Sequence, residues 1–540
     1  MKAIGLAAFC ALATAVSPDA RAQGPDPGPA DWSGGGTCYE IFVRSFQDSD
    51  GDGHGDLDGL IGRLDYLNDG DPAARSDLGV DCIWLMPIAA SPSYHGYDVT
   101  DYYRVDPRYG SNEDFRNLIV EAHRRGIRVL VDMVINHVSS EHPYFKHALL
   151  YPDSPYREWF RWSPEPGPNN EWGDNNWRRS PVREEYYYGF FSHRMPDLNW
   201  ESEAVREEMK RVASFWLDDM GADGLRLDAV WHLMEGADGQ AGHAPRTHDM
   251  LREYGNFVRA AHPGSLTLGE VFDGSDAIFA YYPDQLDAYF AFGVSDAILE
   301  AVRTGRAAGV SESVLRLQER IPDHRWAPFL RNHDQSRTLT YLDGDLAAAR
   351  LAAELLLTVP GLPFIYYGEE IGMTGPKPDP RIRTPMHWNI GPSAGFTTGI
   401  PWEPLQPDSL TANVETLDAE PGSLLDVYRE LIHLRASRPA LGSGDLIALE
   451  VSSPAVAAFV RRRASDAALV IANLGPDPVR APGLRSDAGT IPPGVRSIRS
   501  VYGGAEAAPL EVAPDGSFRG YVPLDEIAPM SMHVFDLVRR

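Results

Sequence analysis

The stretch Ile127-Arg-Val-Leu-Val-Asp-Met-Val-Ile135 is apolar except at Arg128 and Asp132. A short apolar run of this kind, rich in β-branched residues, is typical of a strand that is buried on both faces of a parallel sheet. Amphipathic helical patterns lie on either side of it, at Asn112–Arg125 and Glu203–Met220. An apolar strand between two amphipathic helices indicates an α/β fold.

Similar strand-like runs recur along the first two thirds of the chain, and helical patterns such as Leu346–Thr358 lie between most of them. The eight runs are Tyr39–Phe46, Val80–Pro87, Ile127–Ile135, Gly224–Ala229, Leu266–Phe272, Leu286–Phe292, Trp326–Leu330 and Leu362–Tyr367. Eight parallel strands that alternate with helices predict a TIM (β/α)8 barrel, whose active site lies at the carboxyl ends of the strands.

The chain is longer than one barrel requires, with 540 residues. Residues 138–199, after the third strand, are rich in Trp, Tyr, Pro and Asn and have no strong helical period, which predicts an inserted domain. From residue 437 to residue 540, short strand-like runs alternate with turn residues, which predicts a C-terminal antiparallel β-sandwich. The catalytic barrel would then consist of residues 32–137 and 200–436.

The N-terminus resembles an export signal. Lys2 precedes an apolar run, Ala3–Val16, and the small-residue pattern Ala20-Arg-Ala22 follows, so we expect cleavage of residues 1–22 ahead of a linker at 23–31. The mature protein would be secreted or periplasmic and would retain Cys38 and Cys82. These two can pair in an oxidising compartment if their Cα atoms lie about 4.4–6.8 Å apart, which depends on strand register. The sequence leaves this pairing open.

Charge excludes two classes of partner. Lys and Arg number 49 and Asp and Glu number 77, giving a net charge of −28. Such an acidic surface repels phosphate backbones and anionic lipid, so we expect no nucleic acid partner and no membrane partner after signal cleavage. We expect a monomer.

Polar side chains cluster where the predicted strands end. They are Asp132, Asn136 and His137 at the end of the third strand, Arg226 and Asp228 at the end of the fourth, Glu270 at the end of the fifth, and His333 and Asp334 at the end of the seventh. Arg226 and Asp228 are two residues apart, so both face the same side of a strand. Three carboxylates at one barrel mouth suit glycoside hydrolysis, which needs an acid, a nucleophile and stabilisation of a cationic transition state.

The segments that carry these residues resemble the ordered signature regions of the α-amylase family. They are Asp132–His137, Gly224–His232, Gly269–Phe272 and Phe329–Asp334, with a fifth, Met195–Asn199, at the end of the predicted insertion. The likeness runs from about Gly36 to the C-terminus. It implies a retaining glycoside hydrolase or transglycosylase that acts on α-glucosidic bonds.

The resemblance also implies a role for each matching residue. Asp228 corresponds to the nucleophile, Glu270 to the general acid/base and Asp334 to the third carboxylate that favours the distorted transition state. The substrate-binding residues it implies are Tyr97, His137, Arg226 and His333, with Tyr97 as the platform under the cleaved glucose. An acid must hold its proton near neutral pH, so the pKa of Glu270 should be raised.

An acidic loop follows the first strand. Asp48, Asp50, Asp52 and Asp56 occupy positions 1, 3, 5 and 9 of a calcium-loop spacing, and His54 offers its backbone carbonyl at position 7. Gly59 replaces the glutamate that an EF-hand needs at position 12, so this is not an EF-hand. Similar loops in α-amylase relatives bind calcium, which implies structural Ca²⁺ here.

The sequence allows three interpretations of the function, of which the first is favoured. Tyr94 replaces the carboxylate that closes the pocket of exo-acting relatives, which favours an enzyme that cuts α-1,4 bonds within starch-like glucans and malto-oligosaccharides. Arg381–Trp388 and Ala394–Gly399 instead resemble oligo-1,6-glucosidases, so an exo-α-glucosidase, an oligo-1,6-glucosidase or an α-glucosyltransferase is the alternative. A non-catalytic glycan-binding protein is the third reading, which the complete carboxylate set opposes.

Overall fold

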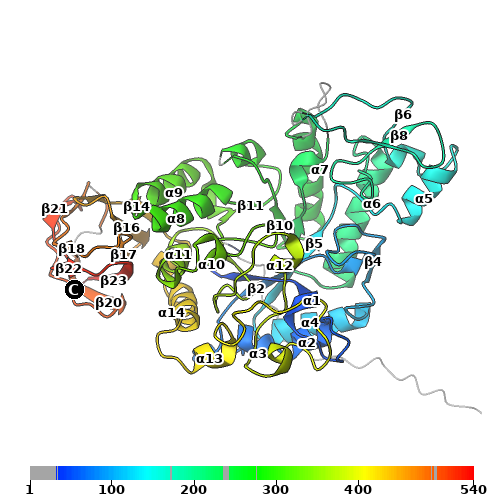
Figure 1. Cartoon of the computed structure of the whole chain (residues 1–540). Helices are drawn as coiled ribbons and strands as arrows, with labels where there is room; N and C mark the ends of the chain where they lie inside the picture. Colours follow the sequence, from blue (N-terminus) through cyan, green and yellow to red (C-terminus); the bar gives the residue numbers. More distant parts are fainter. Residues whose placement is uncertain are drawn as a thin grey trace, which may run out of the picture.

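In the computed structural model, all eight predicted strand runs form strands of one parallel sheet. Figure 1 labels several of these strands at the centre of the molecule. The strands are β1 (Cys38–Ile41), β2 (Cys82–Leu85), β5 (Arg128–Met133), β9 (Gly224–Leu227), β10 (Leu266–Gly269), β11 (Ala288–Phe290), β12 (Trp326–Ala327) and β13 (Phe364–Tyr366). From β1 to β12 each strand pairs with the next in this series, and β13 pairs with β1, so that β12 and β13 are the ends of the sheet. A parallel bridge between Phe329 and Phe364 joins the two ends of the sheet. The predicted TIM barrel is confirmed.

The structure describes residues 32, 35–170, 173–234, 242–274, 276–487, 489–491 and 495–539. The predicted signal (1–22) and linker (23–31) lie outside these residues. In the described part of the chain, no helix combines the length and apolar character that a bilayer span needs.

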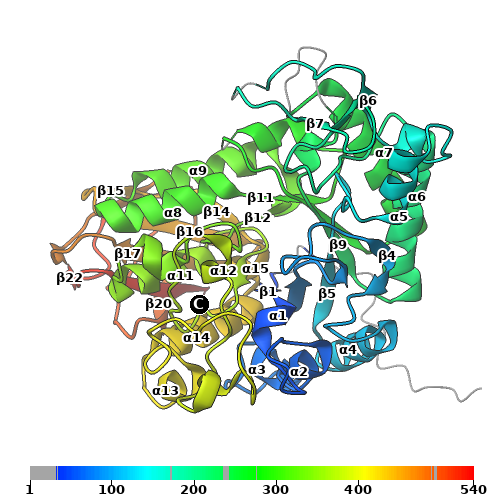
Figure 2. The same cartoon turned by 45° about the vertical axis from the view of Figure 1, so that its right-hand side comes forward.

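Helices surround the barrel on its outer side (Figures 1 and 2). The longer ones are α4 (Asn112–Arg124), α6 (Glu203–Ser214), α7 (Pro245–Ala261), α8 (Phe292–Thr304), α9 (Ala308–Arg320), α11 (Leu346–Thr358) and α14 (Leu424–Ser437). The shorter ones are α1 (Val43–Phe46), α2 (Leu57–Ile61), α3 (Leu64–Leu67), α10 (Thr338–Tyr341), α12 (Asp379–Ile382), α13 (Val414–Asp418) and α15 (Pro439–Ser443). In α4, Ser111 and Asp114 form a reciprocal capping box, which fixes where the helix begins.

One predicted strand is too long. The sequence predicted a strand over Tyr39–Phe46, but it ends at Ile41 and Val43–Phe46 form α1. All of Val43–Phe46 is buried, and periodicity cannot distinguish a buried strand from a short buried helix in an unbroken apolar run.

Cys38 and Cys82 form a disulfide inside the barrel. They are directly opposite each other in the parallel register of β1 and β2, with Cα atoms 4.5 Å apart. Both sulfurs belong to an interior cluster with Trp84, Leu130 and Phe364. The register therefore decides the pairing that the sequence left open.

Between β5 and β9 the chain leaves the barrel. This segment contains α5 (Pro143–Leu150), which the sequence did not predict, and the three-stranded antiparallel sheet β6 (Trp162–Ser163), β8 (Tyr186–Tyr188) and β7 (Trp177–Arg179). Its aromatic side chains pack on one another: the rings of Phe145 and Tyr187 are 5.0 Å apart. Two short strands before α4, β3 (Ala89–Ala90) and β4 (Asp101–Val105), form a separate antiparallel pair.

The C-terminal part is antiparallel, as predicted. Five strands form one sheet, in the order β14 (Asp445–Ala448), β16 (Val456–Arg463), β17 (Asp466–Asn473), β23 (Ser531–Arg539) and β20 (Val495–Tyr502). Shorter sheets contain β15 (Glu450–Val451), β19 (Leu484–Ser486) and β21 (Phe518–Tyr521), and β18 (Val479–Arg480) with β22 (Glu526–Ile527). Side chains of the larger sheets share one apolar core. The C-terminal strands and the inserted segment lie on opposite sides of the barrel (Figure 1).

Candidate active site

Strand alternation brings the polar residues to the barrel interior at its carboxyl end. On β10, Leu266 and Leu268 belong to the interior cluster, and Glu270 is the next residue in that row. The ladder continues past the strand ends, because the backbone N–H of Glu270 donates to Leu227 (3.1 Å) and that of Asp228 donates to Met133 (3.2 Å). Pairing therefore fixes the backbone beneath both carboxylates.

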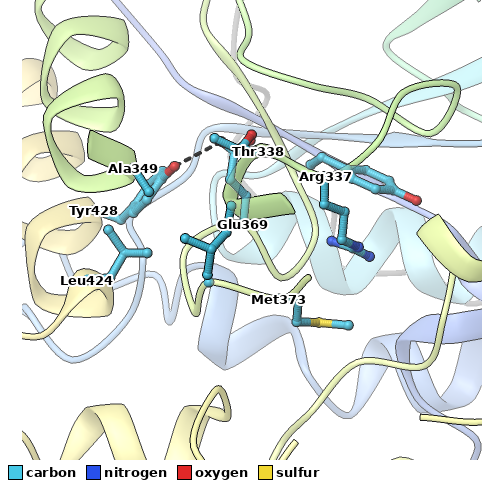
Figure 3. Close-up of a pocket in the computed structure, with 10 residues that line it drawn as sticks. Arg337, Thr338, Ala349, Glu369, Met373, Leu424 and Tyr428 are labelled. Carbon is cyan, nitrogen blue, oxygen red and sulfur yellow. Dashed lines mark hydrogen bonds between the residues drawn. The ribbon is translucent and has the colours of Figure 1, made fainter. Parts of the chain in front are cut away.

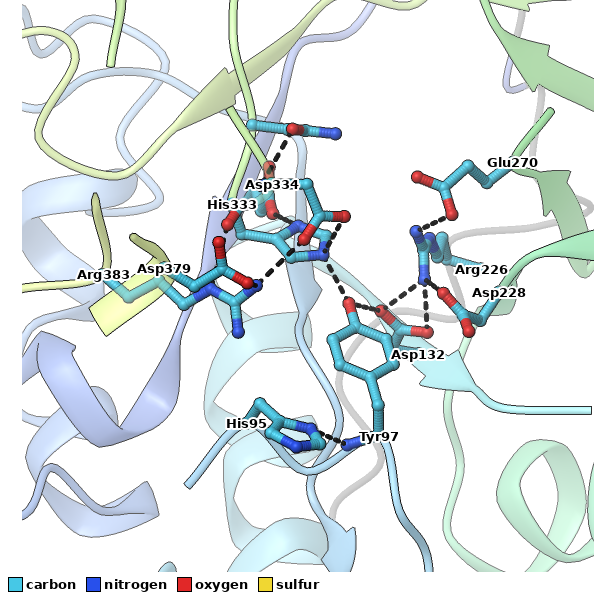
Figure 4. Close-up of polar contacts among 12 residues, drawn as sticks. His95, Tyr97, Asp132, Arg226, Asp228, Glu270, His333, Asp334, Asp379 and Arg383 are labelled. Carbon is cyan, nitrogen blue, oxygen red and sulfur yellow. Dashed lines mark hydrogen bonds and ion pairs between the residues drawn. The ribbon is translucent and has the colours of Figure 1, made fainter. Parts of the chain in front are cut away.

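Arg226 is the centre of the site. Its Nη1 lies 2.8 Å from Asp228 Oδ1 and 2.9 Å from both oxygens of Asp132, while its Nη2 lies 2.7 Å from Glu270 Oε2. The guanidinium is buried and lies over the Trp84 ring, 4.9 Å from its centroid. Asp228 and Glu270 therefore contact opposite nitrogens of one fixed cation (Figure 4).

Burial sets the protonation of two of these carboxylates. It raises the pKa of Glu270 to about 7, against the opposing attraction of Arg226, and the charges of Asp228 and Asp334 add to the rise. Burial also raises the pKa of Asp132 to about 7, again against Arg226. For Glu270, the direction is the one that a general acid requires.

Asp334 reaches the same site from the segment after β12. Its side chain is 42% exposed, and it contacts His333 Nε2 through Oδ2 (3.1 Å) and Arg383 Nη2 through Oδ1 (2.9 Å). Burial raises the pKa of Asp334, but attraction to His333 and Arg383 outweighs it and holds this pKa well below its usual range. Asp334 is therefore an ionised side chain that is partly exposed to solvent.

Tyr97 and His137 belong to this site as well. Tyr97 Oη lies 2.6 Å from His333 Nε2 and donates to Asp132 Oδ2 at 3.1 Å. His137 Nε2 lies 3.1 Å from the backbone oxygen of Tyr97. The structure thus brings together all seven residues that the sequence predicted for catalysis and substrate binding (Asp228, Glu270, Asp334, Tyr97, His137, Arg226 and His333), through direct contacts or one shared partner.

Sequence analysis missed two residues of this network. Glu40 on β1 contacts His333 Nδ1 at 2.6 Å, and Arg383, after α12, contacts Asp334. Glu40 is a charged residue within an apolar strand run, two positions after Cys38. A charged residue in such a run could have indicated a buried polar contact. Arg383 lies in a quoted motif, but its partner comes from a distant segment and only the fold shows it.

Tyr94 lies beside the site and stacks on Trp402. The ring centroids are 5.5 Å apart and the planes differ by 24°. Trp402 is held by its backbone N–H, which donates to Gly53 (2.9 Å), and by its indole N–H, which donates to Ser45 Oγ (2.9 Å). The indole therefore fixes the position of the Tyr94 ring from the side of the acidic loop.

That acidic loop assembles three of the five predicted metal ligands. One carboxylate oxygen from each of Asp48, Asp50 and Asp56 lies within 4.8 Å of the others. The side chain of Asp52 is not part of this group and lies 3.4 Å from His54 Nδ1. Hydrogen bonds to the N–H groups of Asp50, Gly51 and Gly53 also order Asp48. The donor set is all oxygen, which suits calcium.

A small cavity lies between α10, α11, α14 and the loop after β13 (Figure 3). We interpret it as a gap in the packing of these elements, which adds no reactive group to the site. Glu369, in its wall, accepts hydrogen bonds from Thr338 Oγ1 (2.6 Å) and Tyr428 Oη (2.8 Å). Burial raises the pKa of Glu369 to about 7. These two contacts bind the loop after β13 to α10 and α14.

Known proteins resemble this chain over most of its length. The alpha amylase catalytic domain, as a sequence family, matches residues 40–444. Alpha-amylase 3 of Dictyoglomus thermophilum is 38% identical over 449 residues, covering 82% of this chain and 85% of that protein. The oligo-1,6-glucosidase of Heyndrickxia coagulans is 32% identical over 527 residues, covering 83% and 93%. The crystal structure of an α-amylase from H. orenii matches with a TM-score of 0.79 and 37% identity, covering 93% of this chain and 99% of that one.

Proposed function

This chain belongs to the α-amylase family of glycoside hydrolases, and from that premise we propose that it cleaves α-1,4-glucosidic bonds in starch-like glucans and malto-oligosaccharides with retention of configuration. The observation that carries the proposal is the pair of carboxylates on Arg226, with Asp228 on Nη1 and Glu270 on Nη2. Double displacement requires a protonated carboxyl group as the acid and an ionised carboxylate as the nucleophile. Glu270 and Asp228 fit these two roles beside the fixed Arg226 cation.

In the first step, an oxygen of Asp228 attacks the anomeric carbon while Glu270 donates its proton to the leaving glycosidic oxygen. The carbon–oxygen bond to the leaving sugar breaks, and a glycosyl ester on Asp228 forms. In the second step, Glu270 takes a proton from water, whose oxygen attacks the same carbon and releases Asp228. Arg226 keeps the nucleophile oriented in both steps, through its 2.8 Å contact.

The ionised third carboxylate, Asp334, supports the positive charge that develops on the sugar ring. Its two partners, His333 and Arg383, keep it charged and aimed while it opens to solvent. We propose Tyr97 as the platform under the glucose at the cleavage point, with His137 and His333 as donors to its hydroxyls.

We propose that the acidic loop holds a structural Ca²⁺. The carboxylates of Asp48, Asp50 and Asp56 converge, and oxygen donors are the ligands that calcium prefers. The Asp52 carboxylate would join this set only if the loop adjusts, and the backbone carbonyl of His54 is the further ligand that we propose. The loop that would hold the ion is joined to the segment that carries Thr397 and Trp402, because Thr397 Oγ1 donates to Asp48 Oδ2 and the Trp402 backbone N–H donates to Gly53.

Export and domain division are also proposals. The pattern at residues 1–22 supports secretion or a periplasmic location, and the paired Cys38 and Cys82 suit an oxidising compartment. The segment between β5 and β9 supports an inserted domain over 138–199, and the antiparallel sheets support a C-terminal domain over 437–540.

The alternative is an exo-α-glucosidase, an oligo-1,6-glucosidase or a glucosyl-transferring enzyme. Its support is the Arg381–Trp388 segment, whose Arg383 contacts Asp334 directly. A time course of products from soluble starch and from a malto-oligosaccharide blocked at its non-reducing end decides between them. Internal cleavage of both substrates supports the main proposal. Glucose as the sole early product, with the blocked substrate untouched, supports the alternative.

A further inference from the structure

Glu40 is a buried carboxylate at the barrel mouth for which the mechanism above has no use. It is 2% exposed, and its Oε1 lies 2.6 Å from Nδ1 of His333, whose side chain is 1% exposed. On its other side, the His333 imidazole contacts Tyr97 Oη (2.6 Å) and Asp334 Oδ2 (3.1 Å) through Nε2. Glu40 and Asp334 therefore hold the two nitrogens of one ring from opposite sides (Figure 4 shows the Nε2 side).

Counting protons along these contacts fixes the state of the ring. Nε2 lies 3.1 Å from Asp334 Oδ2, a carboxylate oxygen that accepts hydrogen bonds and cannot donate them, so Nε2 must carry a proton. Nδ1 must also carry a proton, because it faces the carboxylate of Glu40. A neutral imidazole has only one proton and would leave a lone pair against an oxygen on one side.

We propose that Glu40 is a positioning residue that keeps His333 doubly protonated, so that Nε2–H remains a charged donor toward Asp334 and toward a sugar hydroxyl in the cleft. The catalytic part of this inference rests on the proposed function. Tyr97 and Arg226 both donate to Asp132, so the contacts that lead from His333 through Tyr97 end at that carboxylate.

The groups that face His333 favour the charged ring. Glu40 comes from β1, Asp334 from the segment of His333 itself, and Tyr97 from the loop after β2, while Trp84 on β2 presents only an aromatic ring, 5.5 Å away. Burial lowers the pKa of His333, but attraction to Asp334 and Glu40 outweighs it and raises this pKa to about 10. Arg383 donates to the backbone oxygen of His333 at 2.9 Å, and Arg226 is separated from the ring by Tyr97 and Asp132.

The direct test is the proton occupancy of His333. Protein labelled with ¹⁵N-histidine is followed by NMR from about pH 6 to about pH 9, a range in which an ordinary histidine becomes neutral. His333→Gln identifies the signals. We expect both ring nitrogens to keep imidazolium-type shifts throughout. Titration of the wild-type ring near pH 6.5, or a missing proton on either nitrogen, would overturn the proposal whatever any variant does.

Glu40→Gln separates charge from hydrogen bonding, because the amide oxygen can still accept from Nδ1. We expect the His333 titration to fall by about 1–3 pH units, the usual effect of removing an opposite charge at contact distance. Glu369→Gln is the matched control, since Glu369 is also a buried glutamate, in the loop after β13, and its hydroxyl partners are Thr338 and Tyr428. It should leave the His333 signals unchanged. An unchanged His333 titration in folded Glu40→Gln would contradict the role of Glu40.

The kinetic test uses an aryl maltoside with an activated leaving group, whose first step needs no proton from Glu270. As the pH rises, the decline of its kcat/KM should begin at a lower pH in Glu40→Gln than in wild type. The displacement should equal the change in the His333 titration that NMR measures, and it should also appear when both proteins carry Glu270→Gln. Coincident pH profiles would overturn the catalytic part. If wild-type protein cleaves no glucan while His333 stays doubly protonated, the proposed function fails and the protonation of His333 stands.

Discussion

The ring of Tyr94 stacks on the indole of Trp402, with centroids 5.5 Å apart. Exo-acting relatives are expected to carry a carboxylate at this position, where it holds the last glucose and closes the pocket. An aromatic pair offers a flat apolar face on which a further sugar can stack. Together, the two rings support a cleft that continues past the glucose over Tyr97.

Internal cleavage is the first expected consequence. Starch viscosity and iodine colour should fall faster than reducing ends appear, and oligosaccharides blocked at the non-reducing end should be cut. Trp402→Ala should raise KM for long malto-oligosaccharides more than for a short aryl maltoside, because it removes support from Tyr94. Trp402→Phe is the control that keeps an aromatic surface. Equal effects of Trp402→Ala on long and short substrates would show that this pair contacts no additional sugar.

The acid role of Glu270 predicts a pH effect with a definite sign. Burial raises the pKa of Glu270 to about 7, so the protonated fraction falls as pH rises through that value. For natural glucans, kcat/KM should therefore decline on the alkaline side of about pH 7. Glu270→Gln should lose about 10²–10⁴-fold on glucans and less than about tenfold on an activated aryl maltoside. Equal losses on the two substrates would assign the acid to another residue.

The acidic loop predicts calcium-dependent stability. A ligand that binds only the folded protein stabilises it by about 2.7 kcal/mol at a hundredfold excess over its Kd. Chelator should therefore lower the Tm of wild type, and Asp50→Ala should abolish that response. Asp58→Ala is the control, because Asp58 is an exposed residue of α2 that lies outside the convergent group. A Tm that neither chelator nor added calcium changes would leave the loop as an acidic turn.

The disulfide predicts resistance to unfolding. Cys38 and Cys82 are 44 positions apart, and closing a loop of this length stabilises a protein by about 2–4 kcal/mol. A double variant, Cys38→Ala with Cys82→Ala, should lower the free energy of unfolding by about that amount in a urea titration. Each single variant also breaks the bridge, so reduced wild-type protein, which keeps both side chains, is the control for the cost of losing them. Two titratable thiols in the denatured, unreduced mature protein would contradict the bridge.

The strand pattern could be predicted because barrel strands are buried on both faces and their apolar runs stand out. The division of Tyr39–Phe46 into β1 and α1 could not, since both parts are apolar and buried. Polar residues at strand ends could be placed by alternation, which is why Arg226, Asp228 and Glu270 meet as expected. Glu40 and Trp402 contact partners 293 and 357 residues away, and Arg383 contacts one 49 residues away. Only the closed barrel brings those segments together.

The central claim, covalent catalysis by Asp228, is tested most directly by trapping the intermediate. A 5-fluoro-α-glycosyl fluoride slows the second step, so a retaining enzyme accumulates the glycosyl ester, and mass spectrometry of the digested protein locates it. The proposed mechanism predicts one added glycosyl group on the peptide that contains Asp228. Asp228→Asn should show no adduct and should lose about a thousandfold or more in kcat. An adduct on a different residue, or none while the enzyme still turns over glucan, would contradict it.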